Sequence, residues 1–233
     1  MSTIVARLTE NLAAVEQRIG AACARVGRSR DEVTLLAVTK TVSPEVAALL
    51  PQLGILDLGE SRPQQLWQRA ALLPRTVRWH LIGHLQRNKI ERTLPLVHRI
   101  HSVDSVRLLQ ALEATGRSVE VFLECNCSGE ASKDGFAPQE LANLPAVLNG
   151  LTHVRIVGLM TMAAYHDDPE QCRPTFALLR QLRDRLRPQL HEHHPLKELS
   201  MGMSNDYEVA IEEGSTVIRL GTVLFAGLDE VEP

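Results

Sequence analysis

The chain alternates short runs of β-branched and apolar residues with stretches of helical periodicity, and the short runs recur eight times. Strands separated by helices run parallel, because each helix returns the chain to the start of the next strand. Eight such units in roughly 200 residues predict an α/β fold, a closed (β/α)₈ barrel of the TIM type. The expected strands are residues 33–40, 54–60, 77–83, 99–104, 119–127, 154–162, 197–203 and 215–222.

An open, doubly wound sheet is the alternative arrangement of parallel strands. Its usual glycine-rich dinucleotide turn, GxGxxG after the first strand, is absent, which favours the barrel. One further helix is expected before the first strand and should end near Gly27. Its apolar positions recur at helical spacing: Ile4, Leu8, Leu12, Val15 and Ile19.

Composition and charge narrow the class of protein. The 233 residues are 44% hydrophobic and contain no long linker, so we expect residues 1–233 to form a single domain. The formal net charge of −3, without a Lys/Arg block, argues against a nucleic-acid partner. Charged residues interrupt the N-terminal apolar pattern, and no apolar run reaches the ~18 residues that span a bilayer. We therefore expect no signal peptide and no membrane partner, and a cytoplasmic protein.

The cysteines and the histidine-rich segment give no metal-binding pattern. The four cysteines contain no CxxC pair, and we interpret them as reduced packing thiols. The segment His191-Glu192-His193-His194 lacks HExxH spacing and follows an expected helix, so we interpret it as a solvated helix cap. No metal site is predicted.

Polar residues gather where the expected strands end, which is where the active sites of such barrels lie. Lys40 ends the first strand, and period two places Leu36, Val38 and Lys40 on one face. The amine should therefore project from an apolar floor, where burial favours its neutral, nucleophilic form. The other polar residues near strand ends are Glu60, Ser61, His80, Ser102, Asp104, Glu124, Asn126, Thr161, Ser204, Arg219 and Thr222.

Two small-residue turns follow the seventh and eighth strands, the usual phosphate-binding position in these barrels. In SMGMS, Ser200, Gly202 and Ser204 share a face, and Ser204 should cap the helix that begins at Asn205-Asp206. Gly221-Thr222 offers a second backbone approach and another hydroxyl. Asp206 is a complication, because a carboxylate repels a phosphate unless it turns outward.

Arg219 lies two residues before Gly221 and should point into the barrel. A buried arginine needs a partner, which a pyridine nitrogen would supply. An ion pair with Glu124 or Glu60 is the structural alternative.

Several segments together resemble the pyridoxal phosphate homeostasis proteins, from about residue 5 to residue 227. They are LLAVTKTVSPE, WHLIGHLQRNK, HSVDSVRLLQAL, CNCSGEASKDGF, VGLMTMA and LSMGMSNDYEVAIEEGSTVIRLGT. The resemblance implies a barrel related to the N-terminal domain of alanine racemase, of PLP fold type III. It also implies Lys40 as the Schiff-base lysine for pyridoxal 5′-phosphate. The predicted cofactor-binding residues are Lys40, Ser61, His80, Met160, Ser200, Met201, Gly202, Met203, Ser204, Arg219, Gly221 and Thr222.

One of these positions departs from the family pattern. The second-strand motif usually reads GEN, whereas here Gly59-Glu60 is followed by Ser61, a shorter hydroxyl in place of an asparagine.

The resemblance implies a function in vitamin B6 and amino-acid homeostasis, as a carrier or regulator without robust catalysis. Apo forms of pyridoxal phosphate enzymes are expected as possible partners, and no catalytic residue is assigned. The rival function is an amino-acid racemase or decarboxylase with the same cofactor. A third possibility is a barrel enzyme for phosphorylated sugars, which would leave Lys40 unmodified.

Three features argue against strong catalysis. Eleven residues follow Thr222, too few for the C-terminal β-domain of alanine racemases, and a monomer is therefore expected. Arg219 should leave a ring nitrogen unprotonated, which weakens the cofactor as an electron sink. Tyr207 should face the helix layer, so Tyr165 is the one tyrosine that could act as an acid opposite Lys40.

Overall fold

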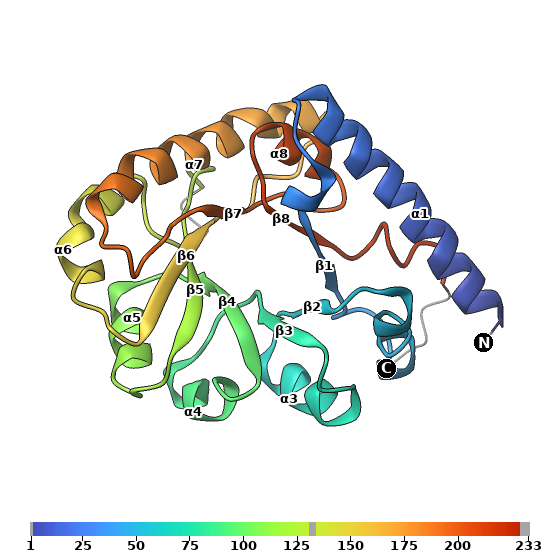
Figure 1. The fold of residues 1–233 in the computed structure, drawn as a ribbon, viewed down its shortest axis with the longest axis horizontal. Coiled ribbons are helices and arrows are strands. Elements are labelled where there is room, and N and C mark those ends of the chain that lie inside the picture. The colour runs from blue at the N-terminus through green and yellow to red at the C-terminus, as the bar shows by residue number, and fades with distance from the viewer. Residues whose placement is uncertain (1, 131–133, 229–233) are drawn as a thin grey trace.

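The computed structural model describes residues 2–130 and 134–228, and its strands form a closed parallel barrel in chain order (Figure 1). Each strand pairs with the next along the chain, and β8 closes the ring on β1 through the register Leu36 to Arg219. This confirms the predicted (β/α)₈ barrel and excludes the open sheet. The strands are β1 (Thr34–Val38), β2 (Asp57–Glu60), β3 (Arg78–Leu81), β4 (Val97–Val103), β5 (Val119–Glu124), β6 (Val154–Met160), β7 (Glu198–Ser200) and β8 (Val217–Leu220).

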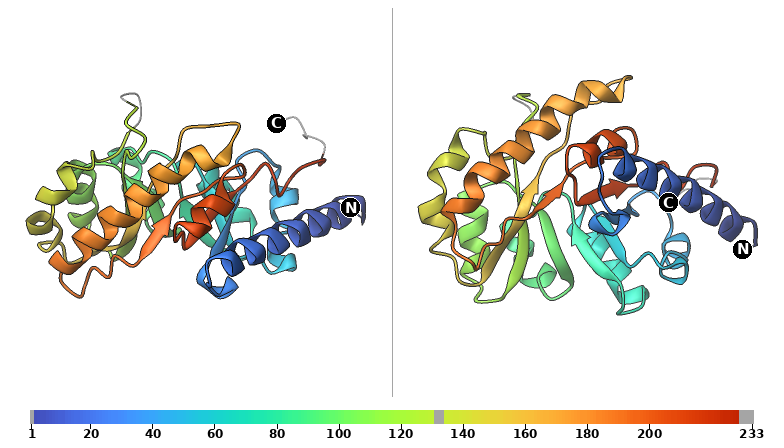
Figure 2. Two further views of the ribbon diagram at one scale, coloured as in Figure 1. Left: turned by 90° about the horizontal axis from the view of Figure 1, so that it is seen from above. Right: turned by 45° about the horizontal axis from the view of Figure 1, so that its top comes forward.

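Helices surround the barrel, as Figures 1 and 2 show. The expected extra helix before the first strand is present, and Gly27 follows it with a φ of +68°, a conformation that glycine adopts without steric cost. The helices are α1 (Ser2–Arg25), α2 (Pro44–Ala47), α3 (Pro63–Leu72), α4 (Ile90–Thr93), α5 (Val106–Glu113), α6 (Pro145–Leu148), α7 (Arg173–Leu186) and α8 (Tyr207–Glu212).

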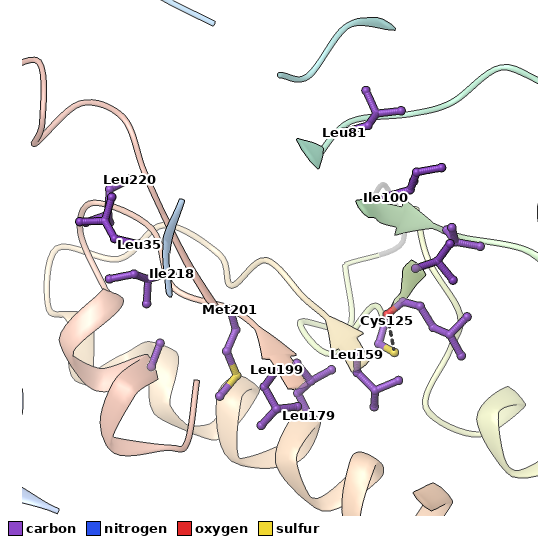
Figure 3. Packing of buried hydrophobic residues seen from close by; sticks show 14 of the residues in the cluster. Leu35, Leu81, Ile100, Cys125, Leu159, Leu179, Leu199, Met201, Ile218 and Leu220 are labelled. Carbon is purple, nitrogen blue, oxygen red and sulfur yellow. Dashed lines mark hydrogen bonds between the residues drawn. The ribbon is translucent and has the colours of Figure 1, made fainter. Parts of the chain in front are cut away.

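The barrel wall separates two apolar clusters, as the alternation of side chains along each strand requires. The larger cluster lies between the strands and the helices and includes Leu35 and Met201 (Figure 3). Leu36 and Val38, on the opposite face of β1, belong to a small interior cluster that also holds Phe122. The predicted orientation of the first strand is therefore confirmed for these apolar residues.

Charged side chains fill the amino-terminal end of the barrel. Arg99 donates to Glu120 at 2.8 Å and to Glu198 at 2.7 Å, and Arg155 also pairs with Glu120. These residues stand at or near the starts of β4, β5, β6 and β7. The opposite, carboxyl-terminal end carries the predicted site residues.

Helix α1 lies along α8 and the segment that follows β8. Arg18 and Arg25 form ion pairs with Glu208 of α8. The side-chain Nδ2 of Asn11 donates to the carbonyls of Leu224 and Ala226, both at 2.9 Å. The extra helix thus fixes the chain just beyond the predicted Gly221-Thr222 turn.

The histidine-rich segment is only partly the solvated cap that was predicted. His194 is buried, and its Nδ1 accepts a hydrogen bond from the amide of Ile156 at 3.2 Å, whereas His191 and His193 are exposed. The polarity of the segment alone does not indicate that His194 is buried, because its hydrogen-bond partner, Ile156 of β6, lies 38 residues away in the chain. Within the described chain, no helix is both long enough and apolar enough to cross a membrane.

Candidate functional site

Lys40 follows β1 in a loop that is fixed from outside the barrel. The Thr39 hydroxyl donates to Glu60 at 2.6 Å, and Glu60 forms an ion pair with Arg69 of α3 at 3.0 Å. Arg69 also donates to the carbonyl of Val42 at 2.5 Å, so both ends of the loop are held by α3. Glu60 is fully buried, and burial raises the pKa of its carboxyl above the usual value.

The Lys40 side chain itself is exposed at the end of β1. The expected burial of the amine against an apolar floor is therefore not found in this structure. The interior residues Leu36 and Val38 form the predicted floor, but the strand ends at Val38, two residues before Lys40. The amine remains accessible to a ligand that enters the mouth of the barrel.

The two predicted phosphate turns lie against each other. The Ser204 hydroxyl oxygen accepts a hydrogen bond from the amide of Val223 at 3.3 Å, which joins the turn after β7 to the turn after β8. Ser204 was predicted to cap the following helix; instead α8 begins at Tyr207, with Asp206 at the N-cap position. The prediction was wrong because the hydroxyl finds a partner 19 residues ahead.

Asp206 turns back into its own loop. Its Oδ1 accepts from the amide of Met203 at 2.6 Å, and the side chain is buried. The carboxylate that seemed to obstruct a phosphate is thus occupied, as is the Met203 amide. The amides of Ser204, Asn205 and Thr222 donate to no acceptor among the described residues.

Glycine is required at the start of the first turn. Gly202 has a φ of +97°, and a Cβ there would lie 2.6 Å from the Cβ of Ala210 and 3.0 Å from the Cα of Tyr207. Its carbonyl accepts from the Arg219 amide at 3.0 Å. The turn can therefore lie close to α8 and β8 only because this residue has no side chain.

Arg219 points into the barrel, as predicted, and is buried there. Its guanidinium donates to the Ser200 hydroxyl at 2.7 Å and to the Thr161 carbonyl at 3.0 Å. Burial lowers the pKa of Arg219 to about 10, while Asp206 and Glu124 favour the charged form, so the side chain is a cation at neutral pH. Neither alternative ion pair is present: Glu60 pairs with Arg69 outside the wall, and Glu124 influences Arg219 by its charge without an ion-pair contact.

His80 and Met160 lie inside the barrel. Met160 belongs to the interior apolar cluster with Phe122. His80 is buried within β3 and bonds to Asp57 and to His101, a residue of β4 that is not among the predicted site residues. A signal for His101 was present, because it stands on the same strand face as Arg99 in a run that ends at the mouth.

The remaining predicted residues occupy different surroundings. Ser61 follows β2 directly and is half-buried, and Thr222 is exposed in its turn. The Met201 side chain packs in the outer cluster (Figure 3), which leaves only its backbone facing the turn. Gly221 approaches β1, since a Cβ there would lie 3.2 Å from the Val38 carbonyl oxygen.

Acidic side chains lie at the carboxyl ends of two neighbouring strands: Asp104 follows β4, and Glu124 ends β5. Burial, together with Asp104 and Asp134, raises the pKa of Glu124 to about 7, although Arg219 opposes the shift. His84, Asp104 and Asp134 bring one ligand atom each within 4.8 Å of one another beside a cavity of about 630 Å³. The absence of a bound metal stays a prediction.

A search for known families matches residues 10–229 to the alanine racemase N-terminal domain. The pyridoxal phosphate homeostasis protein of Aquifex aeolicus is 41% identical over 93% of this chain and 96% of its own length. That of Pseudomonas aeruginosa is 37% identical over 100% of this chain and 99% of its own length. The chain belongs to the pyridoxal phosphate homeostasis protein family. The resemblance seen in the sequence motifs is confirmed.

Solved structures give the same relationship. PipY of Synechococcus elongatus, solved with PLP bound, superposes with a TM-score of 0.80 at 31% identity, over 94% of this chain and 100% of that one. A protein from Bifidobacterium adolescentis reaches 0.90 at 36% identity, with 97% of each chain covered. Alanine racemase from Corynebacterium glutamicum, at 16% identity and a TM-score of 0.72, shares the fold, and this chain covers 63% of it.

Proposed function

We propose that this family member binds pyridoxal 5′-phosphate at the mouth of the barrel, attached covalently to the Lys40 amine. The observation that carries the proposal is the joined pair of turns after β7 and β8. Together they present the amides of Ser204, Asn205 and Thr222, which have no protein acceptor among the described residues. Amides of this kind suit a phosphate dianion, and Arg219 adds a nearby positive charge.

The residues present fit this cofactor. Arg219 is a buried cation whose contacting acceptors are neutral, so it can donate to a ring nitrogen. Ser61, Met160 and Gly221 are proposed to line the rest of the site. When bound, pyridoxal 5′-phosphate supplies a reversible aldehyde for amines and an acceptor of electrons. A guanidinium donor leaves a ring nitrogen unprotonated, so the chain holds the group without strengthening its electron withdrawal.

We propose a role in vitamin B6 and amino-acid homeostasis, as a carrier or regulator that serves apo pyridoxal phosphate enzymes. The names of the relatives support this role. The tyrosines support it too: Tyr207 is buried against α1, with Arg18 over its ring, and Tyr165 is 78% exposed. Tyr207 therefore cannot supply an acid opposite Lys40. The monomer and the cytoplasmic location remain proposals.

A racemase or decarboxylase is the second candidate, and Glu124 is the observation that favours it. A carboxyl with a pKa of about 7 can both give and accept a proton near neutral pH, as a general acid or base does. To distinguish the two functions, the loaded protein is incubated with L- and D-alanine, serine and lysine in deuterated water. A carrier or regulator should exchange the α-proton at a rate near background. Sustained turnover at ~1–10³ s⁻¹ that is lost in Glu124→Gln would support a racemase or decarboxylase.

Binding is tested by absorbance titration of purified protein with pyridoxal 5′-phosphate. The unmutated chain and a Lys89→Ala control should develop the same visible band, and Lys40→Ala should not. Pyridoxal, which lacks the phosphate, should bind far more weakly. Equal binding of pyridoxal and its phosphate ester would contradict the phosphate cradle.

A further inference from the structure

A continuous line of hydrogen bonds crosses the barrel interior from β2 to β8. From the Asp57 carboxylate to the Arg219 guanidinium, successive polar atoms are 3.0, 2.9, 2.8 and 2.7 Å apart. The three residues between these ends are buried. In order, the members of this line are Asp57, His80, His101, Ser200 and Arg219.

The two ends of the line fix its direction. A guanidinium only donates, and an ionised carboxylate only accepts. Burial alone would raise the pKa of Asp57, but hydrogen bonds from Arg78 and His80 bring it well below its ordinary value, so the carboxylate is ionised. Burial lowers the pKa values of His80 and His101, so each ring is neutral and has one proton. The proton of His80 lies on Nε2, toward the carboxylate, and each group between the ends then accepts from the Arg219 side and donates toward Asp57.

This direction assigns every proton in the line. The Ser200 hydroxyl donates to His101 Nδ1, His101 Nε2 donates to His80 Nδ1, and His80 Nε2 donates to Asp57. Both histidines must then be neutral, with the proton on Nε2.

The surroundings of His101 favour the neutral ring. Burial lowers its pKa well below the usual value, and the positive charges of Arg219 and Arg99 lower it further. Phe122 stacks on the ring, with centroids 4.3 Å apart. A second positive charge beside Arg219 would have no carboxylate in contact to balance it.

We propose that Ser200, His101 and His80 position Arg219 as a fixed donor for the cofactor. The inference rests on the proposed function. Because the Ser200 proton is committed to His101, the hydroxyl oxygen is left to accept from Arg219 and cannot compete with it as a donor. The guanidinium is thus held by neutral acceptors, with its other N–H groups available to a ligand.

The direction of the line is tested without cofactor. Protein labelled with ¹⁵N-histidine is studied at pH 7 by two-bond ¹H–¹⁵N correlation spectra, with His80→Gln and His101→Gln used to assign the signals. Both rings should be neutral and carry the proton on Nε2. A proton on Nδ1 of either ring, or an imidazolium, would overturn the assignment.

The effect on the site is tested by cofactor titration of matched serine variants. Ser200→Ala should weaken pyridoxal 5′-phosphate binding by about tenfold, the usual effect of losing a hydrogen bond to a charged group. Ser215→Ala is the control, because Ser215 is equally buried but, among the described residues, its hydroxyl bonds only to backbone carbonyls, including that of Met201 at 2.7 Å. Equal affinity of the two variants would refute the positioning role.

Combining variants separates a chain from independent contacts. If the line acts as a unit, Ser200→Ala with His101→Gln should bind no more weakly than the worse single variant. Losses that add would contradict the chain. If the unmutated protein fails to bind pyridoxal 5′-phosphate, the proposed function fails, while the histidine spectra still decide whether the line exists.

Discussion

At the scale of single residues, the geometry of the site depends on two residues that determine how its turns pack. Gly202 permits the close approach of the SMGMS turn to α8, and Ser204 ties that turn to the one after β8. Two predictions concern these residues.

Gly202→Ala should displace the turn. The new methyl group would lie 2.6 Å from Ala210, in a backbone conformation that alanine disfavours, so we expect a loss of roughly 1–3 kcal/mol in unfolding free energy together with weaker cofactor binding. Gly20→Ala is the control. Gly20 lies inside α1 with open space around it, and alanine there should stabilise by up to about 1 kcal/mol. Urea unfolding measures both, and similar changes in the two variants would refute the steric account.

Ser204→Ala and Thr222→Val should each weaken retention of pyridoxal 5′-phosphate by about 1.5–3 kcal/mol, because each removes a hydroxyl that can donate to an anion. Ser204→Ala should cost more stability than Thr222→Val, since only Ser204 bonds to Val223. Fluorescence titration and thermal melts measure these effects. Unchanged affinity in both variants would show that the hydroxyls do not contact the phosphate.

At the scale of elements, the loop that carries Lys40 is held by α3 through a buried ion pair. Arg69→Met should cost about 3–5 kcal/mol of unfolding free energy, because it leaves the Glu60 carboxylate buried without its partner. Adding Glu60→Gln should recover part of the loss. Arg75→Met, at an exposed position, should stay within about 0.5 kcal/mol of the unmutated protein. No recovery in the double variant would mean that the arginine acts through packing alone.

The sequence was most informative about elements. Period-two alternation placed Leu36, Val38 and Arg219 inside the barrel, and each lies there, because a strand in a barrel has only two faces. Contacts between distant segments could not be predicted. The bond from Ser204 to Val223 and the burial of His194 depend on how turns and strands meet in space. The line of hydrogen bonds through His101 could not be predicted either, because it depends on the register between several strands.

At the scale of the whole molecule, buried neutral histidines make stability depend on pH. Burial lowers the pKa of His194 to about 4, and burial also lowers the pKa values of His80 and His101. The unfolded chain takes up these protons near pH 6.5, before the folded chain does, so stability falls as the pH drops below that value.

For His194 alone the expected loss is about 2 kcal/mol at pH 5, from the difference between the two pKa values. Urea unfolding at pH 7.5 and pH 5 measures the total. His194→Gln, whose side-chain oxygen can still accept from Ile156, should lose less stability over this range. Stability that did not fall between these pH values would contradict the neutral histidines.

The central claim is that Lys40 holds the cofactor at the mouth of the barrel. The protein loaded with pyridoxal 5′-phosphate is reduced with borohydride, digested and mapped by mass spectrometry, which fixes the cofactor to whichever lysine carried it. The chain has four lysines, at positions 40, 89, 133 and 197, and residue 133 lies outside the described residues. The account predicts the pyridoxyl mass on the peptide that contains Lys40. A label confined to Lys89, Lys133 or Lys197, or no label at all, would contradict it.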